Sequence, residues 1–180
     1  MLQLNKIKSQ ASPYWDSLVR VYHASFPIDE QRPIVSMTHL IGHDERFIAY
    51  TLTDEEGHFI GMLTTWHFKE FIYIEHFAIV PTLRSKGYGT EALQAFIKKH
   101  GKPVILEAEP PTDEQSIRRI RFYERCGLTL YEHPYIQPAY TPTSHPVPLC
   151  LMGTIDTDLT PLSLVSDTLH REVYAQSITQ

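Results

Sequence analysis

The segment Arg84–Thr90, RSKGYGT, has the residue types and the spacing of a phosphate-binding loop. It lies between an apolar run and a helical pattern, so its amides fall at a predicted helix N-terminus, where N–H groups lack partners. Gly87 and Gly89 let a bulky anion approach the backbone without meeting a Cβ atom, and Arg84 and Lys86 add positive charge. The segment therefore predicts a binding site for a phosphate or a diphosphate.

Two common phosphate-binding loops match this segment less well. A Walker A loop ends in Gly-Lys-Ser/Thr, whereas Gly89 is followed by Thr90 and Glu91. A dinucleotide-binding loop is the stronger alternative, because Gly87, Gly89 and Ala92 match GxGxxA and two acidic residues lie roughly 20 residues further on. That loop should follow its strand almost at once and needs further strand–helix units. The chain offers neither.

The glycine loop and two further segments together support a family resemblance. Arg84 to Gly89 resembles the R/Q-x-x-G-x-G/A signature of the GNAT superfamily of N-acetyltransferases. Ile120–Leu128, IRFYERCGL, looks like the FYEKxGF segment of that superfamily at the expected distance downstream, and SFPIDEQR is similar to an SFP-x-x-ER segment of some bacterial members. The resemblance spans roughly Trp15 to Gly153 and implies an acetyl-CoA-dependent N-acetyltransferase.

The resemblance implies how acetyl-CoA would be held. Its diphosphate would rest on the glycine loop, and its pantetheine arm would pair with the end of the preceding strand. The residues so implied are Phe77, Ala78, Ile79, Arg84, Ser85, Lys86, Gly87, Tyr88, Gly89, Thr90 and Ser116. Residues 71–80 and 104–108 must then form strands that splay apart, which a bulge before Pro81 would achieve. Many members carry Asn where this chain has Ser116, a departure that would weaken one contact.

Amine acetylation needs a group that takes a proton from the ammonium and a group that satisfies the departing thiolate. Tyr123 matches the family tyrosine that serves the thiolate; its alternative role is an aromatic cover on the sheet. Glu75 is the first candidate for the base, because a carboxylate in a central strand is costly to bury and is expected in a cleft. Glu107 and Glu109 are the other candidates, with a salt bridge to a nearby arginine as their alternative.

Strand alternation places the neighbours of Glu75. It predicts that Glu75 shares a face with Tyr73 and Phe77, while His76 points to the opposite face as a hydrogen-bonded core histidine. Cys126 precedes a helix-ending glycine and is interpreted as a packing residue. Direct transfer without a covalent enzyme intermediate is therefore expected.

Acceptor recognition is expected from the loop after the first helix, from the proline-rich loop and from the end of a central strand. The substrate-binding candidates are Glu30, Arg32, Glu107, Glu109 and Tyr135, with Asp29, Gln137 and Tyr140 beside them. Acidic groups favour a cationic amine, but they do not separate a polyamine, an amino acid, an aminoglycoside and a protein amine. Solvation of a proline-rich surface explains the same residues without any substrate.

The hydrophobic pattern predicts the elements that must position these groups. Helices are expected from Pro13 to Phe26, over 35–41, from Gly89 to Gly101, from Thr112 (a capping box with Gln115) to Gly127, and from Thr160 onward. Strands are expected over 46–53, 59–67, 71–80, 104–108, 128–132 and 149–155. The order predicts a mixed α/β fold with a GNAT-like, mostly antiparallel sheet of about six to seven strands and helices on both faces.

The domain prediction assigns residues 1–155 to the acetyltransferase domain and residues 156–180 to a C-terminal helical extension. Its apolar face, Leu162, Val165, Leu169 and Val173, must be covered by its own domain or by a second subunit, so a homodimer is one of two expectations.

Composition limits the other function classes. A net charge of −5 argues against nucleic acid or a membrane as the main partner, and no apolar run is long enough to span a bilayer. The N-terminus lacks the apolar core of a signal peptide and the two cysteines form no CxxC pair, so a cytoplasmic protein without structural disulfides is expected. Ten scattered histidines do not predict a metal site. The alternative to an enzyme is an acyl-CoA-binding sensor or partner-recruiting module on the same fold.

Overall fold

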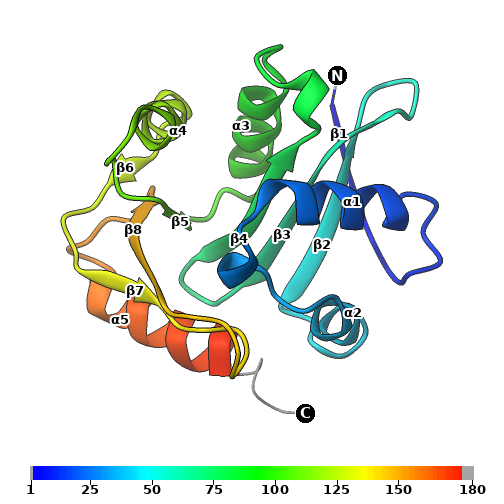
Figure 1. The fold of residues 1–180 in the computed structure, drawn as a ribbon. Helices are drawn as coiled ribbons and strands as arrows, with labels where there is room; N and C mark the ends of the chain where they lie inside the picture. The colour runs from blue at the N-terminus through cyan, green and yellow to red at the C-terminus, as the bar shows by residue number, and fades with distance from the viewer. Residues whose placement is uncertain (1, 176–180) are drawn as a thin grey trace.

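An eight-stranded mixed sheet organises the chain in the order β1-β2-β3-β4-β5-β8-β6, with β7 paired to β8 (Figure 1). The computed structural model describes residues 2–175. The strands are β1 (Gln3–Lys6), β2 (Phe47–Thr53), β3 (Phe59–His67), β4 (Ile72–Ile79), β5 (Val104–Ala108), β6 (Thr129–Leu130), β7 (Tyr135–Gln137) and β8 (Val147–Gly153). Only β4 and β5 pair in parallel among the described strands. The mostly antiparallel sheet is as predicted; β1 and β7 were not foreseen, because such short strands show little alternation.

Helices cover both faces of the sheet, as predicted. They are α1 (Trp15–Ser25), α2 (Ile34–His43), α3 (Tyr88–His100), α4 (Glu114–Arg125) and α5 (Leu162–Thr168), with short turns η1 (Ile28–Glu30) and η2 (Pro81–Leu83) and a π-helical turn η3 (Leu169–Tyr174). Side chains of α1, α2 and α5 enter one core cluster, and those of α3 and α4 enter another. The sheet therefore separates two apolar cores.

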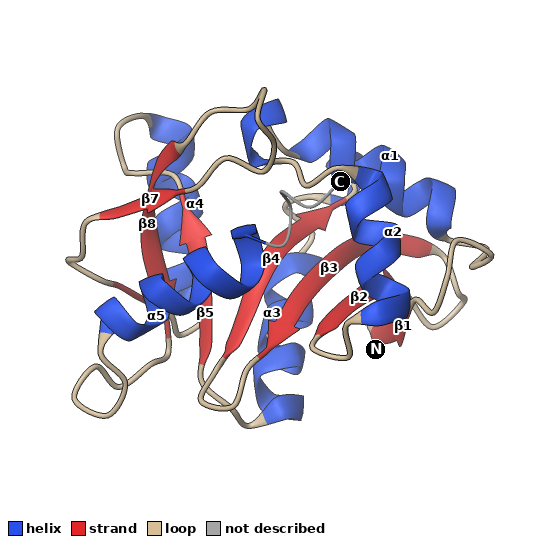
Figure 2. Cartoon of the chain, turned by 90° about the horizontal axis from the view of Figure 1, so that it is seen from below, coloured by secondary structure: helices blue, strands red, loops and turns tan. Residues whose placement is uncertain are grey.

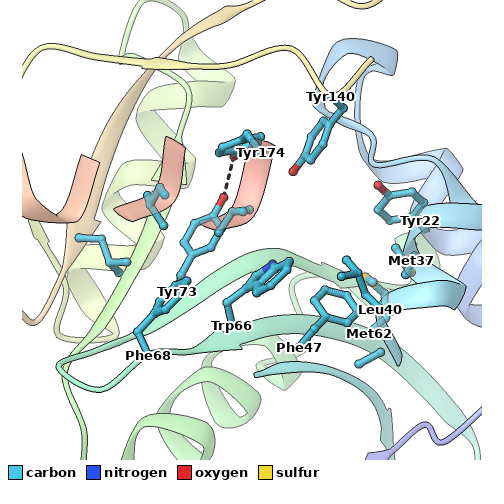
Figure 3. Close-up of a cluster of buried hydrophobic side chains, with 14 of the residues drawn as sticks. Tyr22, Met37, Leu40, Phe47, Met62, Trp66, Phe68, Tyr73, Tyr140 and Tyr174 are labelled. Carbon is cyan, nitrogen blue, oxygen red and sulfur yellow. Dashed lines mark hydrogen bonds between the residues drawn. The ribbon is translucent and has the colours of Figure 1, made fainter. Parts of the chain in front are cut away.

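The larger core lies between the sheet and α1, α2 and α5 (Figure 3). Leu18, Met37 and Trp66 have no exposed surface there, and truncating one such aliphatic side chain to Ala typically costs about 2–5 kcal/mol. Tyr73 and Tyr174 stand in the same core with their hydroxyl oxygens 3.0 Å apart. This face thus contains phenol groups as well as aliphatic side chains.

Strands β4 and β5 pair over only three residues each and then separate (Figure 2). Ile72–Ile74 pairs with Val104–Leu106, and the register between β3 and β4 then shifts, leaving Glu75 as an extra residue on β4. A bulge of this kind bends its strand and increases the local twist. The splay that the sequence predicted is therefore present, and it begins at Glu75.

The C-terminal helix packs on its own chain. Val165, Leu169 and Val173 each have no exposed surface and belong to the core that contains α1 and α2. The sequence predicted that this apolar face is covered either by its own domain or by a second subunit. These three residues of the face are buried within one subunit. Residues 176–180 of the predicted extension lie outside the described residues. Among the residues that are described, no helix has the length and apolar character needed to cross a membrane.

Candidate active site

A cleft of about 940 Å³ opens where β4 and β5 diverge. Its lining includes the expected cofactor residues Phe77, Ala78, Ile79, Arg84, Ser85, Gly87, Gly89 and Thr90, the expected catalytic residues Glu75 and Tyr123, and the acidic residues Glu30, Glu107 and Glu109. Lys86, Tyr88, Ser116, Arg32 and Tyr135 were also expected at the site but are not part of this lining. The structure therefore brings most of the predicted set into one cavity.

Among the described strands, none pairs with the far edge of β4 beyond the bulge. The Val80 N–H donates to Ile60 O on the β3 side at 2.9 Å. Because successive residues of a strand direct their N–H and C=O groups to opposite edges, the groups of Ile79 and Phe77 face the cleft. The Arg84 side chain donates to Ile79 O at 3.1 Å, which leaves the Ile79 N–H on this edge as a donor for a bound group.

The glycine loop turns its amides outward at the start of α3. Ser85 (φ 63°) and Gly87 (φ 87°) both have left-handed backbone conformations, and Gly87 is the N-cap of α3. No side chain caps this helix end, so its first N–H groups have no side-chain acceptor. Consecutive amides in such a turn form a concave anion site, strengthened by the helix dipole. The geometry fits a diphosphate group.

Arginines from the loop and from α4 line the cleft together with carboxylates from η1 and the end of β5. The arginines are Arg84, Arg118, Arg119, Arg121 and Arg125. The carboxylates include Glu30, Glu107 and Glu109, and Glu109 forms an ion pair with Arg119 at 2.5 Å. This lining offers charges of both signs to a ligand.

Tyr123 projects from α4 into the cleft. The residue is only 8% exposed, and burial is the main cause that raises the pKa of Tyr123 to about 12. The phenol thus keeps its proton at neutral pH. No hydrogen bond joins its hydroxyl to another side chain or backbone group in the described part of the chain. Tyr123 is therefore available as a donor to a bound ligand.

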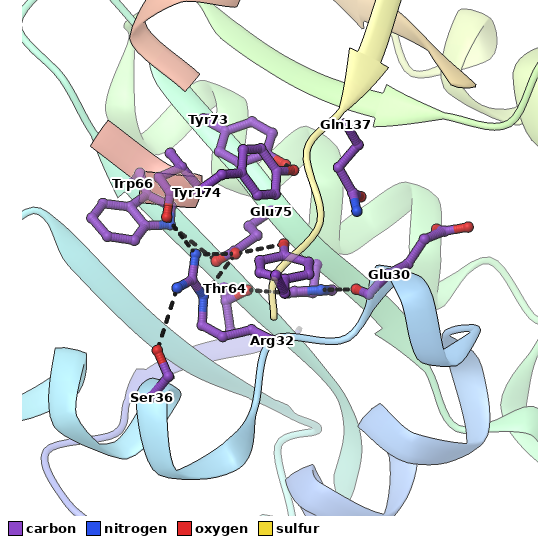
Figure 4. A network of polar contacts seen from close by, with 12 residues as sticks. Glu30, Arg32, Ser36, Thr64, Trp66, Tyr73, Glu75, Gln137 and Tyr174 are labelled. Atoms are coloured by element: carbon purple, nitrogen blue, oxygen red, sulfur yellow. Dashed lines mark hydrogen bonds and ion pairs between the residues drawn. The ribbon is translucent and has the colours of Figure 1, made fainter. Parts of the chain in front are cut away.

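Glu75 lines the cleft, as the sequence predicted, but its carboxylate is paired. Its side chain has no exposed surface, and Arg32 donates to Oε1 from Nε at 2.9 Å and from Nη2 at 2.7 Å (Figure 4). Tyr140 also donates to Oε1 at 2.8 Å, and Trp66 donates to Oε2 at 3.0 Å. Burial is the largest influence and would raise the pKa of Glu75, but Arg32, His76 and the Tyr140 hydrogen bond together hold that pKa below its usual value. Glu75 and Arg32 thus form a buried ion pair, and their roles as base and substrate ligand stay predictions.

The bulge also reverses the predicted side of His76. His76 lies on the same face as Glu75, and Phe77 lies on the other, because the extra residue breaks the alternation. His76 Nε2 donates to Glu30 O at 2.9 Å, which leaves Nδ1 to accept from the Thr64 hydroxyl at 3.1 Å. Burial lowers the pKa of His76. It is a neutral, hydrogen-bonded core histidine, as the sequence predicted apart from its face.

Glu107 is a second buried carboxylate, with a different environment. Tyr135 donates to its Oε1, and the Tyr174 hydroxyl lies 2.8 Å from Oε1 and 2.7 Å from Oε2. Burial is the largest influence and raises the pKa of Glu107 to about 7, although the tyrosine hydrogen bonds act to lower it. This carboxylate can therefore gain or lose a proton near neutral pH.

Two further carboxylates stand near the cleft. Burial first, and then the negative charge of Glu109, raise the pKa of Glu30 to about 7. The side chain of Glu30 points away from the Glu75 network in Figure 4, while its backbone oxygen accepts from His76. Glu109 has the salt bridge that the sequence analysis gave as its alternative role, with Arg119 as partner.

Ser116 has a structural role in place of the expected contact with coenzyme A. Asp113 is the N-cap of α4, its side chain accepts from the Ser116 N–H at 2.8 Å, and the Ser116 hydroxyl accepts from the Asp113 N–H at 3.1 Å. The capping box thus begins one residue later than the predicted pair Thr112 and Gln115. Because its hydroxyl is used at the helix start, Ser116 is not assigned to cofactor binding.

Sequence reasoning missed three parts of the site. Trp66 and Tyr140 as ligands of Glu75, and Tyr174 as a ligand of Glu107, were not foreseen. Trp66 and Glu75 come from neighbouring strands, whereas Tyr140 and Tyr174 lie far along the chain from the carboxylates that they contact. The one available signal was a pair of glutamates in apolar strands, since buried carboxylates require donors.

The comparisons with known proteins agree with this geometry. A sequence model of the acetyltransferase (GNAT) family matches residues 14–128. A solved structure from Bacteroides thetaiotaomicron, provisionally described as a GNAT acetyltransferase, is 32% identical with a TM-score of 0.89, covering 96% of this chain and 98% of that one. A Bacillus subtilis acetyltransferase solved in complex with CoA is 16% identical with a TM-score of 0.56, over 85% of this chain and 97% of that one, and shows a shared fold.

A curated relative gives a shorter match. YjbC of Bacillus subtilis (strain 168), provisionally described as an acetyltransferase, is 34% identical over 102 residues. The match covers 56% of this chain and about half, 50%, of that relative.

Proposed function

The chain belongs to the GNAT acetyltransferase family, and on this premise we propose that it transfers the acetyl group of acetyl-CoA directly to a primary amine. The observation that carries the proposal is that one cleft contains the open edge of β4, the outward amides before α3 and the Tyr123 side chain. These are the groups needed to hold a diphosphate, to pair with an extended arm and to protonate a leaving group. A cationic acceptor is supported by the carboxylates of Glu30, Glu107 and Glu109, which line the same cleft.

Acetyl-CoA fits the residues that line the cleft. The amides from Ser85 to Thr90 would bind its diphosphate, with Arg84 and the α4 arginines as counter-charges. The open edge of Phe77 and Ile79 would pair with its pantetheine arm. When bound, acetyl-CoA supplies an activated acetyl thioester and a thiolate leaving group. The CoA complex of a Bacillus subtilis protein that shares the fold is consistent with this assignment.

Ile79, Glu107 and Tyr123 would then each serve one part of the reaction. The Ile79 N–H donates to the acetyl carbonyl oxygen as that oxygen gains negative charge. Glu107 accepts a proton from the acceptor ammonium, directly or through water, so that the amine nitrogen can form its bond to the acetyl carbon. Tyr123 would donate its proton to the sulfur as the carbon–sulfur bond breaks, and the nitrogen would give up its second proton to the resulting Tyr123 phenolate, which restores the phenol and leaves a neutral amide.

Glu107 is proposed as the base in place of Glu75. Both residues line the cleft, but Glu107 is surrounded by phenols, which carry no positive charge. Glu75 is held as a carboxylate by Arg32, so a proton on it would break a buried ion pair. Glu30 and Glu109 would bind the positive charge of the acceptor at the mouth of the cleft.

Neither described cysteine lines the cleft, and burial raises the pKa of the Cys126 thiol. Direct transfer is therefore proposed, in preference to an acyl-enzyme.

The test is thiol release from acetyl-CoA in a panel of primary amines, comparing the wild type with Tyr123→Phe and Glu107→Gln. We expect each variant to lower kcat about 10²-fold, the usual scale for one proton-transfer group, while calorimetry shows retained coenzyme A affinity. Tyr131→Phe is a matched control, since its hydroxyl donates to Ile155 O at 3.0 Å, outside the cleft.

Two outcomes would contradict the proposal. Coenzyme A binding without thiol release from any amine would support the sensor alternative. Absence of coenzyme A binding by folded protein would exclude both functions.

A further inference from the structure

The C-terminal turn reaches the carboxylate of Glu107. Tyr174 ends η3, well beyond residue 128, where the match to the family ends. Its hydroxyl contacts both carboxylate oxygens, at 2.8 and 2.7 Å, and lies 3.0 Å from the Tyr73 hydroxyl. Tyr174 is 1% exposed. A residue outside the matched region thus forms part of the environment of the proposed base.

Several contacts fix the position of this turn. Arg32 donates from Nη2 to Val173 O at 3.0 Å, and Arg46 pairs with Glu172 at 2.9 Å. Val173 itself is fully buried. The turn is therefore fixed to the same guanidinium that neutralises Glu75, and the Tyr174 hydroxyl is held in a defined place rather than free to rotate away.

The surroundings of Glu107 contain phenols and one other carboxylate. The titratable groups that face it are Tyr73 and Glu75 from β4, Tyr135 from β7, Tyr140 from the loop between β7 and β8, and Tyr174 from η3. Strand β8 and helix α5 contribute the apolar side chains Leu149, Leu151 and Val165 to the same core. Phenol hydrogen bonds favour the charged form of a carboxylate, whereas burial and the charge of Glu75 favour the neutral form.

We propose that Tyr174 is a positioning residue that favours the ionised form of the Glu107 carboxylate and fixes that carboxylate in its place at the cleft. The inference rests on the proposed function, in which Glu107 accepts the proton of the amine. The C-terminal turn is thereby a working part of the active site as well as a cover for the core. Tyr135 supports the same carboxylate from β7, so the two phenols have additive roles.

The test measures the ionisation of Glu107 directly. NMR titration of protein labelled with ¹³C at the glutamate carboxyl carbon is carried out on the wild type, Tyr174→Phe and Tyr131→Phe, and the Glu107 signal is assigned by its loss in Glu107→Gln. Loss of a hydrogen bond to the charged form should raise the Glu107 midpoint by about one pH unit in Tyr174→Phe. Tyr131→Phe, which removes a hydroxyl of the same kind bonded to Ile155 O, should leave it unchanged.

The kinetic arm uses the pH profile of kcat/KM with one amine. A base must be deprotonated to work, so activity rises through its pKa, and this acidic limb should move upward by the same amount in Tyr174→Phe. The ionisation of the amine itself is common to all variants and cancels in the comparison. A lower kcat with an unmoved limb would mean that Tyr174 only packs, and would overturn the inference.

The two proposals can fail separately. An unchanged Glu107 midpoint in folded Tyr174→Phe would refute the role of Tyr174 even if the protein acetylates amines. Absence of thiol release by the wild type would refute the proposed function and the catalytic consequence, while the titration would still decide whether Tyr174 controls Glu107.

Discussion

Glu75 and Glu107 lie on neighbouring strands at the start of the same splay, and the protein treats the two carboxylates in opposite ways. Glu75 accepts from the guanidinium of Arg32, an indole and a phenol, and its pKa lies below the usual value. Glu107 accepts from phenols alone among the groups described around it, and burial raises its pKa to about 7. Similar positions in the fold therefore do not imply similar chemistry.

The pKa values differ because the donors around the two carboxylates differ in charge. A buried charge is stable only if a partner compensates for the lost hydration. An opposite charge does this fully and fixes the ionised state, whereas neutral donors do it in part and leave the two states close in free energy. The first arrangement holds a structure together. The second suits a group that must exchange a proton in each turnover.

The largest expected effect is the loss of stability on Glu75→Gln. The substitution removes the Glu75 charge from the buried ion pair with Arg32, whose side chain is 0% exposed. Breaking a buried pair in this way typically costs about 3–5 kcal/mol. Denaturant unfolding should show this loss, while the kcat of the folded fraction stays within several-fold of the wild type. A large loss of kcat in stably folded Glu75→Gln would restore Glu75 as a candidate base.

The matched control is Glu114→Gln. Glu114 pairs with Arg118 on the surface of α4, with side chains 81% and 74% exposed. Exposed pairs contribute less than about 1 kcal/mol, so the control should unfold close to the wild type.

The next effect is on the pH dependence of stability, where the two carboxylates act in opposite directions. Glu107 has a folded-state pKa of about 7, above its usual 4.5, so the folded protein binds more protons than the unfolded chain between these values. Stability should therefore fall as pH rises from about 4.5 to 7, by about 1–3 kcal/mol, and level off above. The lowered pKa of Glu75 contributes stability above pH 4.5 that is lost as the pH falls further.

Glu107→Gln isolates the first of these terms. Unfolding measured at a series of pH values should show a smaller decline between about 4.5 and 7 than in the wild type, because Glu30, whose pKa is also raised to about 7, still contributes to it. The same decline in both proteins would assign it to another group and would weaken the comparison.

The contrast also separates what the sequence could predict from what it could not. The glycine loop, the open end of β4 and Tyr123 line one cleft, as the sequence predicted, because each depends on a short local motif. The roles of Glu75 and Glu107 depend on Arg32 and Tyr174, which are distant in the sequence. Polar pairing across such distances leaves no periodic signal, so the two glutamates looked alike.

One local irregularity accounts for the misplaced side chains. Alternation assigns faces correctly until a strand gains an extra residue, and the register shift at Glu75 moved His76 and Phe77 to the faces opposite to those predicted. The bulge itself was expected somewhere before Pro81, but no residue type marks its position. The start of α4 was predicted one residue too early, because Thr112 and Asp113 are both suitable N-cap residues.

The smallest expected effect concerns Glu109, a carboxylate between the two extremes. Its side chain is 37% exposed and pairs with Arg119, which is 36% exposed, so solvent already compensates much of its charge. Glu109→Gln should change the free energy of unfolding by less than about 1 kcal/mol and raise the acceptor KM a few-fold with kcat nearly unchanged, because a distant counter-charge adds to binding but not to proton transfer. Steady-state kinetics with a cationic and a neutral amine checks this: the KM change should appear with the cationic amine only. An equal loss with both amines, or a loss in kcat, would place Glu109 in the chemistry and remove the distinction between Glu107 and its neighbours.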